Sequence, residues 1–124
     1  MPARSKSRTT TNPHGHGALV ERRLPKHQPP THPGEMLLEE FLKPLGITQT
    51  QFAERLGVSY PRLNQIVRGK RSVTPDTALR LAQVTGMSAD FWLGLQLDWD
   101  LWHALRAETT REIARLKPLD TSQP

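Results

Sequence analysis

Residues 47–72 read ITQTQFAERLGVSYPRLNQIVRGKRS, and this stretch contains two short helix-like segments on either side of a glycine. Thr48, followed three residues later by a glutamine, has capping-box spacing and predicts the start of the first helix. Gly57 predicts the end of that helix, and Ser59 predicts the start of a second helix, which Gly69 stops. Two short helices joined by a turn of about three residues that contains glycine form a helix-turn-helix unit.

The two helices of this unit have distinct apolar and polar faces. From the apolar spacing, the residues predicted to face inward are Phe52, Ala53, Leu56, Leu63, Ile66 and Val67. The polar face of such a second helix can enter the major groove of DNA, with its N-terminal residues at the base edges. Asn and Gln side chains suit adenine, Arg suits guanine, and Pro or Tyr can touch a thymine methyl group. The predicted base-reading residues are Tyr60, Pro61, Arg62, Asn64 and Gln65.

Basic residues are concentrated in and after this unit. From Arg55 to Arg80 the chain has six basic residues and one acid, Asp76. Cations just past a recognition helix can meet DNA phosphates. The phosphate contacts predicted from the residues themselves are Thr48, Ser59, Arg68, Lys70 and Arg71.

A helix is also predicted before the unit, from Pro33 to about Gly46. Proline is favourable at a first helical position because its missing N–H has no partner to lose there. An apolar stripe with helical spacing follows; it consists of Leu37, Phe41 and Leu45, with Leu38 and Leu42 beside it.

Two more helices are predicted after the unit. Thr74 caps the first, which ends at Gly86; its predicted inward residues are Ala78, Leu79, Ala82 and either Leu81 or Val84. Ser88 caps the second, which we expect to continue to about Lys117; its apolar residues are Phe91, Trp92, Leu95, Trp99, Trp102 and Leu105. No segment alternates as a strand does, so the sequence predicts an all-α fold with five helices.

Charge and composition divide the chain of 124 residues into three parts. Residues 1–31 are predicted to be a disordered basic tail, because they have too little apolar surface to offset the entropy of ordering. Six basic residues and one acid give residues 1–32 a charge of +5, whereas residues 33–124 hold eleven of each sign. We expect a helix-turn-helix domain at residues 32–108 and a C-terminal helical extension and tail at residues 109–124. The basic tail and the basic segment favour a polyanion as partner.

Several classes of function are disfavoured by the composition. The chain has no cysteine, which suits a reducing cytoplasm, and no apolar run long enough to span a membrane. His14 and His16 form a weak metal motif, so no metal or other cofactor is predicted. Neighbouring acids such as Glu39 and Glu40 do not face one another on a helix, and no nucleophile or phosphate loop accompanies them. We therefore predict that the chain is not an enzyme.

The block from His32 to about Leu105 resembles the HigA family of antitoxins, a branch of the lambda-repressor-like (XRE) helix-turn-helix proteins. The resemblance is carried by three segments, HPGEMLLEEFL, ITQTQFAERLGVS and LNQIVRGKRSVTPDTALRLAQVTGMSADFWLGLQLDWDL. It does not extend to residues 1–30 or to the tail after about Glu108. Trp99 is a further departure, since the family often has a smaller aromatic residue at that position.

The resemblance implies two activities: a homodimer binds a palindromic operator in its own promoter, and the antitoxin neutralises a small ribonuclease toxin, HigB. It also implies that Gln49 contacts a phosphate and that Tyr60, Pro61, Asn64 and Gln65 occupy base-reading positions. Either Trp99 or Trp102 is expected at a dimer seam.

Other interpretations remain open at the level of sequence. One alternative is a stand-alone XRE transcriptional repressor without a toxin partner, and another is an adaptor whose helix-turn-helix contacts protein. We expect the basic tail to bind DNA phosphates; the competing idea is that its apolar residues Leu19, Val20 and Leu24 fold against the toxin.

Overall fold

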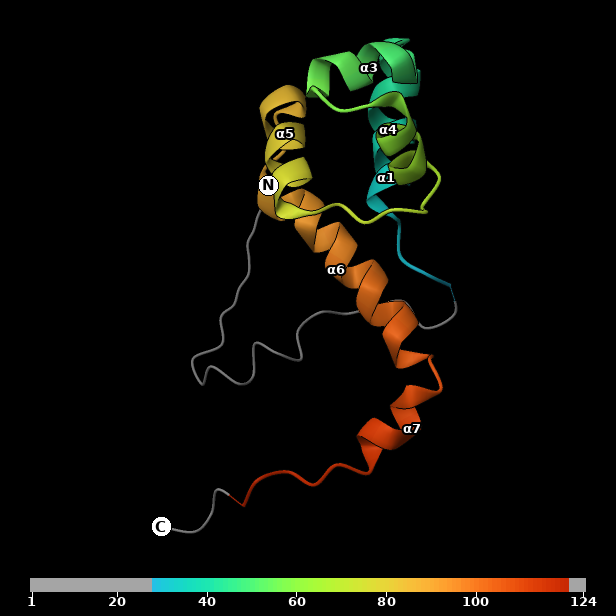
Figure 1. Ribbon diagram of the computed structural model, residues 1–124, viewed down its shortest axis with the longest axis vertical. Helices are drawn as coiled ribbons and strands as arrows, with labels where there is room; N and C mark the ends of the chain where they lie inside the picture. Colours follow the sequence, from blue (N-terminus) through green and yellow to red (C-terminus); the bar gives the residue numbers. More distant parts are fainter. Residues whose placement is uncertain (1–27, 121–124) are drawn as a thin grey trace.

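The computed structural model describes residues 28–120, and every regular element in that range is a helix (Figure 1). The elements are α1 (Pro33–Leu37), the π-helix η3 (Leu38–Leu42), α2 (Lys43–Leu45), α3 (Gln49–Leu56), α4 (Tyr60–Val67), α5 (Pro75–Thr85), α6 (Ala89–Leu105) and α7 (Thr109–Ala114). The first three follow one another without a break, so they correspond to the one helix predicted before Gly46. The all-α class is confirmed, whereas most of the predicted basic tail lies outside the described residues.

Polar side chains begin the helices at the predicted places. Thr48, Ser59, Thr74 and Ser88 each accept a hydrogen bond from the backbone N–H three residues later, at the starts of α3, α4, α5 and α6. At α3 the capping box is complete, because the Gln51 side chain also accepts from the Thr48 N–H at 2.9 Å. These bonds satisfy N–H groups that have no partner within the helix.

The first helix departs from the predicted pattern through its π-helical middle. In a regular α-helix the position after Leu37 on the same face is Phe41, four residues on. The wider turn of η3 takes one more residue, so Leu42 is the fully buried position at 2% exposed, while Phe41 is partly buried and packs against the core. Pro44 contributes, because it has no N–H to donate to the carbonyl four residues before it. The prediction that Leu45 continues the inward stripe is wrong, since Leu45 is 66% exposed.

The core lies where α1, α3, α4, α5 and α6 meet. Its buried apolar residues are Leu37, Leu42, Phe52, Ala53, Leu56, Leu63, Ile66, Val73, Ala78, Leu81 and Trp92. The core position predicted for Trp92 is confirmed, and its indole N–H donates to the Thr85 hydroxyl at 3.3 Å. The buried Gln96 of α6 accepts from the Val73 N–H at 2.8 Å and so ties the segment before α5 to α6.

One face of α5 differs from the prediction. Leu79 is 64% exposed, and the inward positions belong to Thr77, Ala78 and Leu81. The apolar pattern gave the wrong prediction because it counts only apolar residues. It favours Leu79, whereas Thr77 is buried and its hydroxyl has polar partners.

The chain after α6 is not one continuous helix, so the expected extension of α6 to Lys117 is wrong. The helix ends at Leu105, and α7 follows as a separate short helix that points away from the bundle (Figure 1). The Thr110 hydroxyl donates to the Ala104 and Leu105 carbonyls at 2.9 and 3.1 Å. A side chain thus bonds carbonyls at the end of α6, of which that of Ala104 also accepts from the Ala107 N–H at 3.2 Å.

Candidate nucleic-acid interface

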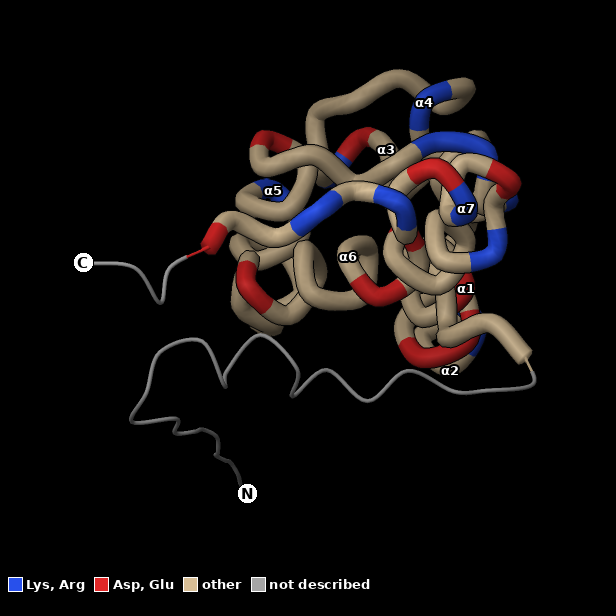
Figure 2. Tube along the Cα trace, turned by 90° about the horizontal axis from the view of Figure 1, so that it is seen from below, with Lys and Arg blue, Asp and Glu red and all other residues tan. Residues whose placement is uncertain are grey.

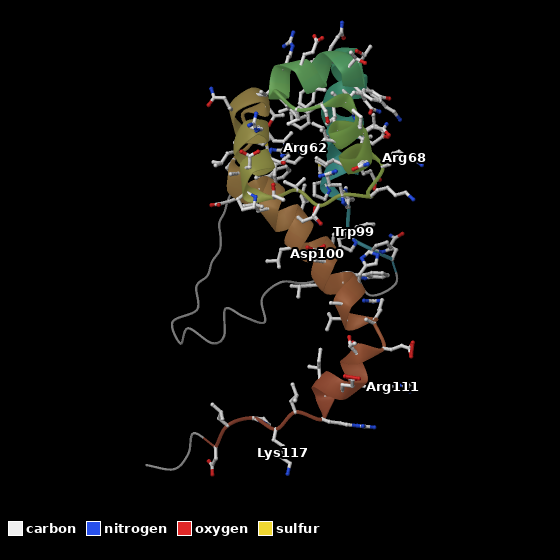
Figure 3. The ribbon with its side chains drawn as sticks, viewed as in Figure 1. Arg62, Arg68, Trp99, Asp100, Arg111 and Lys117 are labelled. Atoms are coloured by element: carbon white, nitrogen blue, oxygen red, sulfur yellow. The ribbon has the colours of Figure 1, made fainter. Side chains whose placement is uncertain are left out.

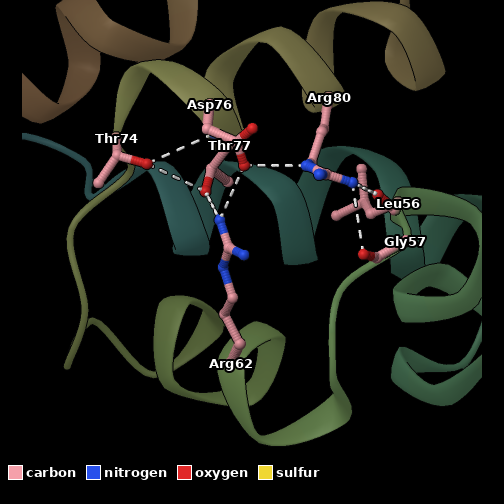
Figure 4. Close-up of polar contacts among 7 residues, drawn as sticks. All are labelled: Leu56, Gly57, Arg62, Thr74, Asp76, Thr77 and Arg80. Atoms are coloured by element: carbon pink, nitrogen blue, oxygen red, sulfur yellow. Dashed lines mark hydrogen bonds and ion pairs between the residues drawn. The ribbon is translucent and has the colours of Figure 1, made fainter.

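The helix-turn-helix consists of α3, a tight turn and α4. Gly57 ends α3 in the left-handed region, with φ of 73°, a conformation that glycine adopts without strain. The Arg80 side chain on α5 donates to the carbonyls of Leu56 and Gly57 at 2.9 and 3.3 Å (Figure 4). A side chain from a third helix therefore holds the turn that sets the angle between α3 and α4.

The first helix holds α4 from its other side. A methyl group added at Gly34 would lie 1.8 Å from the Ile66 carbonyl oxygen and 2.8 Å from the Val67 Cα. Only a glycine lets α1 approach the backbone of α4 this closely. The inward anchors of α4, Leu63 and Ile66, are buried as predicted.

The outer face of α4 carries most of the predicted base-reading residues. Tyr60, Pro61 and Gln65 are exposed, and Asn64 is half-buried. Asn64 lies beside Gln49, the first residue of α3, with its amide nitrogen 3.0 Å from the Gln49 amide oxygen. The structure thus brings a predicted base reader and a predicted phosphate contact together across the two helices.

Arg62 differs from its expected position as a base reader. Its guanidinium donates to the Thr77 hydroxyl at 2.6 Å and to the Asp76 carboxylate at 3.2 Å, so it is turned towards α5 (Figure 4). Arg80 reaches the same carboxylate oxygen at 2.9 Å. These hydrogen bonds, first from Arg80 and then from Arg62, lower the pKa of Asp76. Two of the six cations counted in the basic segment therefore share the one acid of that segment.

The remaining predicted phosphate contacts form two groups. The hydroxyl oxygens of Thr48 and Ser59 are used as caps, but each hydroxyl keeps its own hydrogen for donation. Arg68 is exposed at the C-terminal end of α4 (Figure 3), and Lys70 and Arg71 are exposed in the loop that follows.

The end of α4 and its loop are richer in cations than the opposite edge of the domain, around α2. Lys and Arg occur at the C-terminal end of α4, in its loop and on α7, whereas acids lie around α2 and also on α3, α5 and α6 (Figure 2). An anionic ligand would therefore be drawn to the α4 side of the molecule.

Sequence reasoning missed the residues that position this face. Gly34, Thr77 and Arg80 act through contacts with elements that are distant in the chain. The one available signal was the i, i+4 spacing of Asp76 and Arg80 on a predicted helix.

Two other kinds of site are absent from residues 28–120. No three metal-binding side chains come together in that range, and His14 and His16 lie outside it. No helix in the same range has the length and apolar character needed to cross a bilayer.

The fold and this face define a helix-turn-helix protein of the lambda-repressor-like (XRE) class, and a helix-turn-helix family model matches residues 38–92. The chain is 43% identical over 93 residues to the virulence-associated protein I of Dichelobacter nodosus, covering 75% of this chain and 84% of that protein. It is 38% identical over 93 residues to antitoxin HigA-1 of Vibrio cholerae, covering 75% and 87%. The structure of the Pseudomonas aeruginosa antitoxin HigA with the higBA promoter superposes with a TM-score of 0.67 at 39% identity, covering 73% of this chain and 98% of that one. The chain belongs to the HigA family of antitoxins.

Proposed function

We propose that this protein is a cytoplasmic antitoxin that binds a palindromic operator as a homodimer, represses its own operon and neutralises a HigB-type ribonuclease toxin. The observation that carries the DNA-binding part is the outer face of α4, where Asn64 and Gln65 stand beside three exposed cations. The similarity to a HigA protein solved with its promoter supports the same assignment.

The proposed division of labour follows from chemistry. Asn64 and Gln65 read base edges, with Tyr60 and Pro61 beside them, because amides match the donors and acceptors in the major groove. Arg68, Lys70 and Arg71 bind phosphates and set the register of the protein on the duplex, as do Thr48, Gln49 and Ser59. Arg62 stabilises the position of α4 through its bonds to Asp76 and Thr77 on α5.

Residues that contact bases can be distinguished from those that contact phosphates by measuring how variants bind two duplexes. One is the DNA upstream of the reading frame and the other has a random sequence. The Asn64→Ala variant should lose roughly 1–3 kcal/mol on the operator and little on random DNA. Its matched control, Arg68→Ala, removes an exposed cation and should weaken binding to both duplexes. Equal losses on both duplexes for Asn64→Ala would refute the base-reading assignment.

A homodimer places two copies of α4 about one DNA turn apart, roughly 34 Å, or a multiple of that spacing. Footprinting should show two inverted half-sites. A single half-site bound tightly by a monomer would contradict the dimer.

The antitoxin activity is tested in cells. The small protein encoded next to this one should arrest growth when expressed alone, and co-expression of this chain should restore growth. An Asn64→Ala, Gln65→Ala double variant should still restore growth while losing repression, because the two tasks use separate surfaces. If no neighbouring product is toxic, or a toxic one is not neutralised, the protein is a stand-alone repressor of the same class.

A further inference from the structure

The two amide side chains on the outer face of α4, Asn64 and Gln65, are not equivalent. The Gln65 amide oxygen accepts a hydrogen bond from the Arg71 Nε–H at 2.8 Å. An arginine N–H can only donate, so the end of the Gln65 amide that faces Arg71 must be the oxygen. Between Asn64 and Gln49, by contrast, either amide can be the donor, and exchanging oxygen and nitrogen on both side chains preserves their bond. Chemistry therefore fixes the orientation of Gln65 and leaves that of Asn64 open.

The backbone after α4 places Arg71 at this position. Gly69 has φ of 74°, and the Lys70 N–H donates to the Gln65 carbonyl at 2.8 Å. This closure folds the loop back onto the last turn of α4. Arg71 is thus held beside Gln65 by the helix end itself.

The amide nitrogen of Gln65 makes no hydrogen bond to any residue among 28–120, and the side chain is exposed. Its two N–H groups are consequently the part that is available to a ligand. A base that meets this end of Gln65 meets hydrogen-bond donors, because the oxygen is turned towards Arg71.

Guanine and adenine differ in the hydrogen-bonding groups that they offer to the Gln65 side chain. Guanine presents two acceptors in the major groove, N7 and O6, whereas adenine presents the N7 acceptor beside an amino donor. The usual glutamine–adenine pair needs both the oxygen and the nitrogen of the amide. The bond from Arg71 turns the Gln65 oxygen towards the loop, so an adenine amino group could use the second lone pair of that oxygen only at the end that Arg71 holds.

We infer that Arg71 fixes the Gln65 amide with its nitrogen towards the base, so that Gln65 selects guanine over adenine in the operator. This inference rests on the proposed DNA-binding function and reverses the preference expected from the glutamine side chain alone. Arg71 acts through Gln65 and is a specificity-determining residue that need not touch a base.

Contact with DNA does not require the bond between Arg71 and Gln65 to break. The bond uses the Nε–H of Arg71, and the four N–H groups on the two terminal guanidinium nitrogens take no part in it. These groups can meet a phosphate while Nε continues to hold Gln65.

The test uses the full chain and a pool of random duplex DNA from which bound sequences are selected. The position read by Gln65 is the one whose base preference disappears in Gln65→Ala. The parent protein should prefer guanine there by about tenfold over adenine. Replacing that guanine by 7-deazaguanine, which lacks the N7 acceptor, should weaken binding by the parent and have little effect on Gln65→Ala.

Arg71→Met removes the donor and keeps the length of the side chain, so the freed Gln65 should shift its preference towards adenine. Lys70→Met is the matched control, because it removes the neighbouring cation and leaves the Gln65 side-chain contact in place. It should lower the affinity for all duplexes and retain guanine. The inference is overturned if the parent prefers adenine at this position, if no position depends on Gln65, or if Arg71→Met behaves as Lys70→Met does. If no sequence is enriched by the parent at all, the proposed function fails as well.

Discussion

The helix-turn-helix block (residues 33–85) and the C-terminal arm (residues 102–120) are both helical, but their hydrogen bonds span different distances along the chain. In the block, Arg62 reaches Thr77, 15 residues away, and Arg80 reaches the Leu56 carbonyl, 24 residues away. In the arm, the Thr110 hydroxyl reaches carbonyls five and six residues before it. Long-range contacts fix the angle at which α4 is presented, whereas these local bonds shape the arm.

The largest expected loss of stability comes from adding a side chain where α1 approaches α4 closely. Gly34→Ala places a methyl group against the Ile66 carbonyl, which is backbone and cannot rotate away. We expect a loss of about 3 kcal/mol in the free energy of unfolding, measured by urea denaturation.

Gly46→Ala is the control for this change. Gly46 has φ of 65° but no atom within 4 Å of an added methyl group, so its cost is backbone strain alone, about 1 kcal/mol. Equal losses for the two variants would show that the approach of α1 to α4 is not tight.

The next largest loss of stability is expected at Arg80, whose side chain holds the turn between α3 and α4. Arg80→Met keeps much of the aliphatic stem and removes the bonds to the Leu56 and Gly57 carbonyls, so we expect a loss of about 1–2 kcal/mol in unfolding free energy. Arg111→Met makes the same exchange at an exposed position in the arm and should stay within about 0.5 kcal/mol of the parent. A similar loss at both positions would remove the contrast between block and arm.

A smaller effect is expected from pH. Burial lowers the pKa of His32 below its usual value of 6.5, with Asp100 raising it and His103 lowering it further. The neutral ring accepts from the Gly34 N–H at 2.9 Å and caps α1. Because the unfolded chain takes up this proton more readily, the stability is complete above about pH 6.5 and is lost as the pH falls towards the lower pKa of the folded state.

His32→Asn retains a capping side chain and removes the titrating ring. Its unfolding free energy should change less than that of the parent between pH 8 and pH 5. The lowered pKa of Asp76 has the same sign but acts only below its usual value of 3.8, outside this range. Parallel pH profiles for parent and variant would exclude His32 as the cause.

The smallest effect on global stability is expected in the arm. Thr110→Ala removes two hydrogen bonds that are local, so the unfolding free energy should change by less than about 0.5 kcal/mol. Amide hydrogen exchange in α7 should nevertheless become faster, because the junction with α6 loosens. A global loss comparable to that of Arg80→Met would mean that the arm is part of the cooperative unit.

The sequence predicted what short-range rules determine. The caps at Thr48, Ser59 and Thr74 depend on residues three positions apart, so the starts of α3, α4 and α5 were predictable, and with them the helix-turn-helix. The contact of Arg62 with α5, and that of Arg80 with the Leu56 and Gly57 carbonyls, depend on where α5 lies in space, which no spacing in the sequence encodes.

The incorrect predictions also arose because the sequence does not show contacts between side chains that the fold brings together. The apolar pattern selected Leu79 over Thr77 because it does not register that a buried threonine has found polar partners. On the outer face of α4, the sequence predicted that Gln65 is exposed, but which end of its amide is available depends on where Arg71 folds back.

The π-helix η3 has a consequence for which changes in chain length the first helix can absorb. Leu37 and Leu42 both lie in the core although they are five residues apart. Deleting the exposed Glu40 leaves them four residues apart, the spacing of one face of a plain α-helix. Such a shortened chain keeps Gly34 against α4 and Leu42 in the core, whereas an added residue demands a second wide turn. The wide turn thus predicts that deletion of Glu40 is tolerated better than the insertion of a residue beside it.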